Sequence, residues 1–363
     1  MKTQCDNIQI EYFAAANTSD GFFSLFDKVF SPEKFEKIYI LKGGPGCGKS
    51  TLLKRVAQKA KKLGYSSEIY YCSQSPTSLD GVVIPELSVA ILDGTSPHTR
   101  DPIYPAVCEN IVNLGQAWDI EKAGAINEKV RQLTKNKKSC FGKAYAYLSS
   151  VAGANSVIDG CVSKYLLESK LERNVERICS KLKIKTGDGE KHELFTDCNS
   201  AAGNIHLFTF ENLAQNRYFI KDFAGIARYY FDFLRYELER RKIDFTTALD
   251  TLEPCFASGI YIEGIKTSFT LYDDDYARTL DRQQIDYKII NCARFCHTDN
   301  YHKQKVFLKY AEKSKKVLLD GAMRELALAG KLHDDIEKLY YEITDYSVVE
   351  KIGDELLISI FGE

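Results

Sequence analysis

Apolar and polar segments alternate along the first hundred residues in the order expected of a sheet covered by helices. Residues 37–42 (KIYILK) form a short apolar run, which is typical of a buried strand. A glycine-rich segment follows, and residues 52–63 then show a helical pattern that ends at Gly64. Further apolar runs predict strands at 67–72, 82–84 and 89–93. This order predicts an α/β fold with a mostly parallel sheet flanked by helices.

From about residue 105 the pattern becomes helical. The helical segments are 108–114, 121–133 and 141–182. Residues 186–204 are polar, contain Gly, Asp, Ser and Asn, and show little periodicity, which indicates a linker. The sequence therefore predicts an N-terminal domain of residues 1–185, the linker, and a C-terminal domain of residues 205–363.

The C-terminal domain repeats features of the N-terminal one. Residues 218–221 (YFIK) echo residues 39–42 (YILK) at an offset of 179. Three further pairs keep nearly the same offset: Gly46 with Gly225, Asp93 with Asp273, and Gly142 with Gly321. A chance alignment is the alternative, but a nearly constant offset over about a hundred residues favours a tandem duplication of one α/β domain.

The segment that joins the strand at 37–42 to the following helix is a candidate phosphate loop. It matches G-x-x-x-x-G-K-[ST] in full, from Gly43 to Ser50, with a strand before it and a helix after it, which predicts that the α/β fold is of the P-loop NTPase type. Glycines let backbone N–H groups turn toward phosphate oxygens, and the N-terminus of the following helix adds a positive dipole. Lys49 would reach the β- and γ-phosphates of ATP, and Ser50 would ligate Mg²⁺. The predicted nucleotide-binding residues are Gly43, Gly44, Pro45, Gly46, Cys47, Gly48, Lys49, Ser50 and Thr51.

Asp93 is the candidate acid on the metal side of this site. Four apolar residues precede it, as in a Walker B strand, so its carboxylate would hold a water bound to Mg²⁺; a turn-capping aspartate is the alternative. Gly94 follows it, so a water-activating base has to lie elsewhere. Asp80 and Glu86 are the candidates for a catalytic role beside Lys49; turn chemistry at Asp80-Gly81 and a solvated Glu86 are the alternatives.

The cysteine content and the net charge indicate the cellular compartment and the kinds of partner to expect. The eleven cysteines are odd in number and contain no CxxC, which favours free thiols in a reducing cytoplasm. Cys47 lies close to a helix N-terminus, a position expected to lower the pKa of its thiol. The net charge of −1 argues against nucleic acid and anionic membrane as bulk electrostatic partners, although it leaves room for a local basic patch. No run of about 18 apolar residues occurs, so we expect no membrane partner. The match at residues 43–50 makes ATP the expected partner.

The motifs together resemble a known family. They are Tyr12-Phe13, Asn17-Thr18, Tyr39 to Gly46, Ser78 to Gly81, Ile84 to Leu87, Asp93 to Thr95, Pro97-His98 and Ile111 to Trp118. They resemble bacterial tandem P-loop proteins of clostridia and bacilli that are described only as ATPases or ATP-binding proteins. The resemblance implies ATP binding and a duplicated fold, and it implies no substrate.

The second copy departs from this pattern at the loop. Residues 222–230 keep one loop glycine, Gly225, while Arg228 stands in the place of Lys49 and Tyr229 in that of Ser50. We therefore expect a degenerate second loop in a scaffold or regulatory lobe. The predicted function is a Mg²⁺-dependent ATPase whose nucleotide state moves one lobe against the other. A nucleoside or small-metabolite kinase and a non-enzymatic interaction protein with bound ATP are the alternatives.

Overall fold

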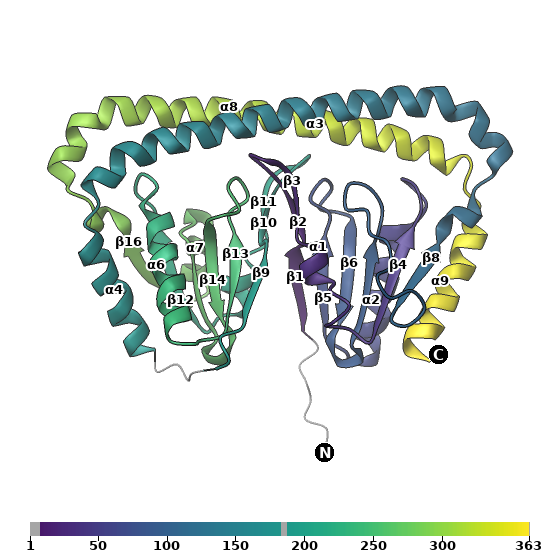
Figure 1. Ribbon diagram of the computed structural model, residues 1–363, viewed down its shortest axis with the longest axis horizontal. Coiled ribbons are helices and arrows are strands. Elements are labelled where there is room, and N and C mark those ends of the chain that lie inside the picture. The colour runs from purple at the N-terminus through teal and green to yellow at the C-terminus, as the bar shows by residue number, and fades with distance from the viewer. Residues whose placement is uncertain (1–7, 183–186, 363) are drawn as a thin grey trace, which may run out of the picture.

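The computed structural model describes residues 8–182 and 187–362, which form two similar α/β halves beneath a pair of long helices (Figure 1). Each half contains one six-stranded mixed sheet of mostly parallel strands. The α/β class expected from the sequence is therefore observed in both halves.

The first sheet has the strand order β1-β5-β6-β7-β4-β8, in which β6 is antiparallel to both neighbours and every other pair is parallel. The strands are β1 (Gln9–Phe13), β4 (Lys37–Lys42), β5 (Ser67–Tyr71), β6 (Leu79–Ile84), β7 (Val89–Asp93) and β8 (Glu109–Asn113). The helical elements are α1 (Phe26–Val29), α2 (Lys49–Leu63), η1 (Pro85–Leu87) and η2 (Leu114–Ala117), and β2 (Ala15–Thr18) pairs with β3 (Gly21–Ser24).

The second sheet, read from its inner edge, has the order β9-β13-β14-β15-β12-β16, with the one antiparallel strand, β14, in the place of β6. The strands are β9 (Lys191–Leu194), β12 (Asn216–Lys221), β13 (Phe245–Leu249), β14 (Ala257–Ile262), β15 (Thr267–Leu271) and β16 (Lys288–Asn291). The other elements are the hairpin β10 (Asp197–Ser200) and β11 (Gly203–His206), α5 (Thr209–Leu213), α6 (Ile226–Arg240), η4 (Glu263–Ile265), α7 (Asp274–Arg282) and η5 (Cys292–Phe295). The two sheets share strand order and strand direction.

Two long helices each connect one half to a shorter helix that packs in the other half. Helix α3 (Ile120–Val162) leaves the first half, crosses the molecule and, after η3 (Ser163–Tyr165), delivers α4 (Glu168–Lys181) to the second half (Figure 1). Helix α8 (Thr298–Tyr341) runs back and delivers α9 (Tyr346–Phe361) to the first half. Val175 of α4 belongs to the core of the second half, and Val349 of α9 belongs to the core around α2. The core of each half is therefore completed by a helix that reaches it through a long helix from the other half.

The halves meet at their inner edges. Phe13 at the end of β1 pairs with Phe195 just after β9, with a backbone N–H bonding the partner's carbonyl in each direction at 2.9 and 3.1 Å. Asn17 and Asn199 donate their side-chain amides to each other's backbone carbonyls at 2.7 and 3.2 Å. Reciprocal contacts of this kind give the pair of halves a twofold character.

Three expectations about organisation are corrected. Residues 109–113 of the expected helix 108–114 are not helical, because they form β8 and pair in parallel with β4; this tertiary pairing overrides a short ambiguous apolar pattern. Residues 186–204 are not simply a linker, because β9 completes the second sheet and the hairpin of β10 and β11 lies at the contact between the halves. The boundaries 1–185 and 205–363 do not separate two independent packing units, because α4 and α9 are exchanged.

The sequence pairing of Asp93 with Asp273 is also wrong. Asp93 aligns with Leu41 in the first sheet, and the matching pair in the second sheet is Leu271 with Ile220. Asp273 instead caps the N-terminus of α7 by accepting from the N–H of Tyr276 at 2.7 Å. The second half therefore has no carboxylate on β15 at the position of Asp93.

Candidate functional site

The glycine-rich loop lies where three neighbouring parallel strands end. Strand β4 ends at Lys42, and its two parallel neighbours β7 and β8 end at Asp93 and Asn113. After β4 the chain continues to β5, on one side of β4 within the sheet, and it later forms β8 on the other side of β4. Ligands in open α/β sheets bind outside the carboxyl ends of strands at such a point. The loop thus occupies the edge that the topology favours for a ligand.

The conformation of the loop requires its glycines. Gly46 and Gly48 have φ of +71° and +89°, values that residues other than glycine rarely adopt. A Cβ on Gly43 would lie 2.5 Å from the Sγ of Cys47. The N-cap of α2 is Gly48, which has no side chain to cap the helix. The first-turn N–H groups of a helix need partners, so this end suits an anion.

Lys49, Ser50 and Asp93 are brought together at this edge. The Lys49 ammonium donates to the carbonyls of Gly43 at 3.0 Å and Gly44 at 2.8 Å, and lies 3.5 Å from the Asp93 carboxylate. The other Asp93 oxygen accepts from the N–H and hydroxyl of Thr95 at 2.9 and 2.6 Å.

The hydroxyl of Ser50 accepts from the N–H of Leu79 at 2.9 Å, which ties the start of α2 to β6. A serine hydroxyl and a carboxylate at one edge of the sheet are oxygen ligands of the kind that Mg²⁺ takes, together with several waters. Pro45 is half-buried and Thr51 is exposed.

Asp80 lies at the same edge but its side chain is engaged elsewhere. Its carboxylate is 3.4 Å from Nε2 of His98, and both side chains are buried. The His98 ring stacks on Phe26 with centroids 4.2 Å apart. Burial lowers the pKa of His98, but the hydrogen bond and charge of Asp80 outweigh it and raise that pKa. Asp80 is therefore a partner of His98, one residue from the backbone that contacts Ser50.

Glu86 is not at the loop. It follows β6, which runs antiparallel to β7, so the end of β6 lies at the opposite edge of the sheet from Lys49. There Glu86 accepts from the N–H of Ser66 at 2.9 Å. The sequence could not reveal this placement because an apolar run does not tell the direction of its strand. A catalytic role for Glu86 beside Lys49 is therefore dropped.

The expectation for Cys47 is wrong in sign. Its side chain is buried, and burial raises the pKa of the thiol despite the nearby charge of Lys49. Desolvation of the thiolate here outweighs the helix terminus.

The ends of the long helices cover the loop, and the sequence patterns did not identify them. The hydroxyl of Tyr346 donates to the carbonyl of Gly46 at 2.7 Å. A Cβ on Gly44 would lie 3.1 Å from both Trp118 and Tyr340. The Nε1 of Trp118 is buried without a hydrogen-bond partner. Tyr340 and Tyr346 lie too far along the chain for any local motif to associate them with the loop.

The matching loop of the second half is closed by its own side chain. Asp222 accepts from the N–H groups of Gly225 and Ala227 at 2.9 and 2.8 Å, so a carboxylate already holds the N-terminus of α6. Arg228 pairs with Glu253 at 2.9 Å. The N–H groups that would bind a phosphate here are occupied.

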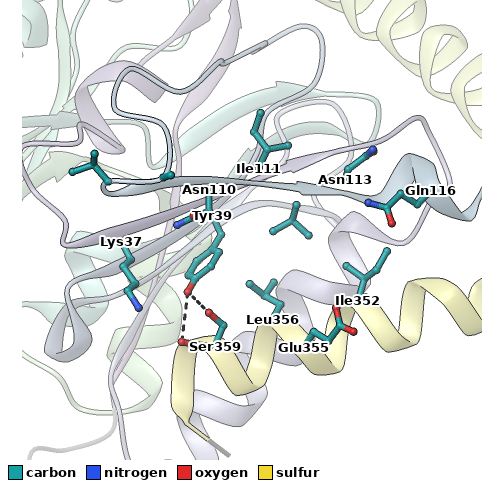
Figure 2. A pocket seen from close by; sticks show the side chains of 13 residues that line it. Lys37, Tyr39, Asn110, Ile111, Asn113, Gln116, Ile352, Glu355, Leu356 and Ser359 are labelled. Carbon is teal, nitrogen blue, oxygen red and sulfur yellow. Dashed lines mark hydrogen bonds between the residues drawn. The ribbon is translucent and has the colours of Figure 1, made fainter.

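A pocket of about 510 Å³ lies apart from the loop, between β8 and α9 (Figure 2). Ile111, Ile352 and Leu356 line it, and the hydroxyls of Tyr39 and Ser359 lie 2.7 Å apart beside it. None of residues 43–51 lines this pocket. The pocket is therefore separate from the glycine-rich loop.

Comparison of the chain with protein-family models, with curated proteins and with solved structures gave no match. Within residues 8–182 and 187–362, no group of three or more His, Cys, Asp or Glu side chains is arranged to hold a metal ion. No helix in the same ranges is both long and apolar enough to cross a bilayer. The geometry of the loop thus carries the functional argument.

Proposed function

We propose that the chain binds one Mg·ATP at residues 43–51 and hydrolyses it. The backbone of the loop would hold the phosphates, and Lys49 would contact the β- and γ-phosphates. Ser50 and Asp93 would hold Mg²⁺, directly or through water, and the metal would neutralise charge that develops on the phosphates.

One observation carries this proposal: the contrast between the two helix N-termini. In the first loop the position that corresponds to Asp222 is Gly43, which has no side chain, and Lys49 and Asp93 lie 3.5 Å apart there. The N-terminus of α6 is held by Asp222. Two halves with the same strand order thus differ at the position where one loop retains the full phosphate-loop pattern. The shared topology also supports an origin by tandem duplication.

Movement of the halves is the expected consequence of binding. The cover over the loop includes Tyr340 and Tyr346, which belong to the helices that return from the second half. A triphosphate in the loop has to alter these contacts, and a displacement there acts on α8. The ten cysteines of the described ranges are free thiols, which supports a cytoplasmic location.

Phosphate release by the purified chain tests the proposal. Wild type should release phosphate from ATP with Mg²⁺ and without a second substrate. Release of ADP only in the presence of a nucleoside or metabolite would favour a kinase. Tight ATP binding with neither activity would favour a non-enzymatic partner protein.

A further inference from the structure

Three titratable side chains of the long helices converge over the phosphate loop. Lys137 belongs to α3, whereas His333 and Glu337 belong to α8. The Lys137 ammonium lies 3.3 Å from Nδ1 of His333, and Nε2 of His333 lies 3.5 Å from the Glu337 carboxylate. These residues join both long helices to the loop at one place.

Glu337 lies against the part of the loop that would receive phosphate. A Cβ on Gly46 would come within 3.0 Å of the Glu337 carbonyl oxygen. Burial raises the pKa of the Glu337 carboxyl, while the Gly46 backbone, Lys49 and Lys137 act in the opposite direction. The carboxylate thus lies among the groups that would hold a phosphate anion.

Lys137 is a second cation at this position. Burial lowers its pKa, and the charge of Glu337 is among the influences that oppose this effect. Burial, Lys137 and Lys49 lower the pKa of His333 to about 4, so the imidazole is neutral at pH 7 and its Nδ1 can accept from Lys137. Lys137 therefore has a neutral imidazole and one carboxylate as neighbours.

The second half shows what a closed version of this arrangement looks like. At an offset of 178, Asn155 and Asp159 of α3 take the places of His333 and Glu337. Asp159 accepts from the hydroxyl of Tyr229 at 2.6 Å, and Asn155 donates to Glu253 at 2.8 Å. Asp159 therefore bonds to the degenerate loop itself, and Asn155 bonds to the carboxylate that pairs with Arg228 of that loop. At the same offset Lys315 of α8 takes the place of Lys137, so the two halves differ mainly in the loop itself, where Asp222 occupies the N–H groups of Gly225 and Ala227.

Building on the proposed function, we propose that Lys137 and Glu337 form the terminal-phosphate subsite of the nucleotide site. Glu337 holds the loop when no nucleotide is bound. A triphosphate displaces the Glu337 carboxylate, and Lys137 then contacts its terminal phosphate. A diphosphate is too short to reach Lys137, so the long helices distinguish ATP from ADP.

Nucleotide affinities of single variants test this subsite. Calorimetry with Mg²⁺ would compare a non-hydrolysable ATP analogue with ADP on wild type, Lys137→Ala and Glu337→Gln. Loss of a charge-assisted contact should weaken analogue binding to Lys137→Ala about tenfold or more, and ADP binding less than about twofold. Glu337→Gln should bind both nucleotides more tightly, because a competing anion is neutralised. Lys138→Ala is the matched control, since Lys138 is the exposed neighbour on α3, and it should behave as wild type.

Equal losses of analogue and ADP affinity in Lys137→Ala, or no loss of either, would overturn the subsite while leaving nucleotide binding to the loop in place. Unchanged or weaker binding by Glu337→Gln would overturn the displacement. If wild type binds neither nucleotide, the proposed function fails as well, and the subsite fails with it.

Discussion

Replacing Lys49 by alanine is the most informative single change in the glycine-rich loop. Its side chain is only 11% exposed and donates to two loop carbonyls, Gly43 at 3.0 Å and Gly44 at 2.8 Å. These are contacts of a nucleotide-free loop, and we expect the ammonium to exchange them for phosphate oxygens when Mg·ATP binds.

The size of the effect follows from the contacts that Lys49 would make. A hydrogen bond to a charged group contributes about 1.5–3 kcal/mol, so two of them to phosphate oxygens contribute about 3–6 kcal/mol. That range corresponds to a loss of roughly two to four orders of magnitude in ATP affinity. The fold should persist, because Asp93 keeps its two bonds from Thr95 when the lysine is removed.

Calorimetric titration with Mg·ATP analogue, together with thermal unfolding, would measure both quantities. Lys54→Ala is the control, because Lys54 is an exposed lysine of the same helix whose ammonium bonds the carbonyl of Thr77 at 2.6 Å. It should retain wild-type affinity. A folded Lys49→Ala chain that binds the analogue as wild type does would refute the assignment of the site.

Asp93→Asn should retain part of the nucleotide affinity and lose at least about tenfold in Mg²⁺-dependent phosphate release, and full release would remove Asp93 from the metal site. Burial raises the pKa of the Cys47 thiol, so mass spectrometry should show slower alkylation of Cys47 in the folded than in the denatured chain; equal rates would contradict this. Burial lowers the pKa of His206, but Asp197 and Glu211 outweigh it and raise that pKa from 6.5 to about 10. Protonated His206 therefore stabilises the fold fully below about pH 6.5, and this contribution is lost as the pH rises toward 10. Urea unfolding should show a steeper loss of stability over that range for wild type than for His206→Gln, and identical profiles would count against the ion pairs.

The place of the glycine-rich loop between a strand and a helix could be predicted from the sequence because its determinants are local. The strand, the glycines, Lys49 and Ser50 are contiguous, and Asp93 follows an apolar run whose strand pairs directly with β4. The position of Glu86 could not be predicted in the same way, because it depends on the antiparallel direction of β6 within the sheet.

The cover of the loop depends on tertiary structure alone. Lys137, His333 and Glu337 look like ordinary polar positions of long helices, and only the antiparallel pairing of α3 with α8 brings them to the loop. The exchange of α4 and α9 escapes sequence patterns for the same reason, since each helix is amphipathic whichever half it covers. The repeated sequence pattern did indicate two similar halves.

The stoichiometry of nucleotide binding tests the central claim most directly. Calorimetric titration of the nucleotide-free chain with a non-hydrolysable ATP analogue and Mg²⁺ should give one site per chain, and Lys49→Ala should abolish it. In the second half Asp222 occupies the N–H groups of the loop and Arg228 is paired with Glu253. A stoichiometry of two, or a binding event that survives Lys49→Ala and disappears in Arg228→Ala, would contradict the account.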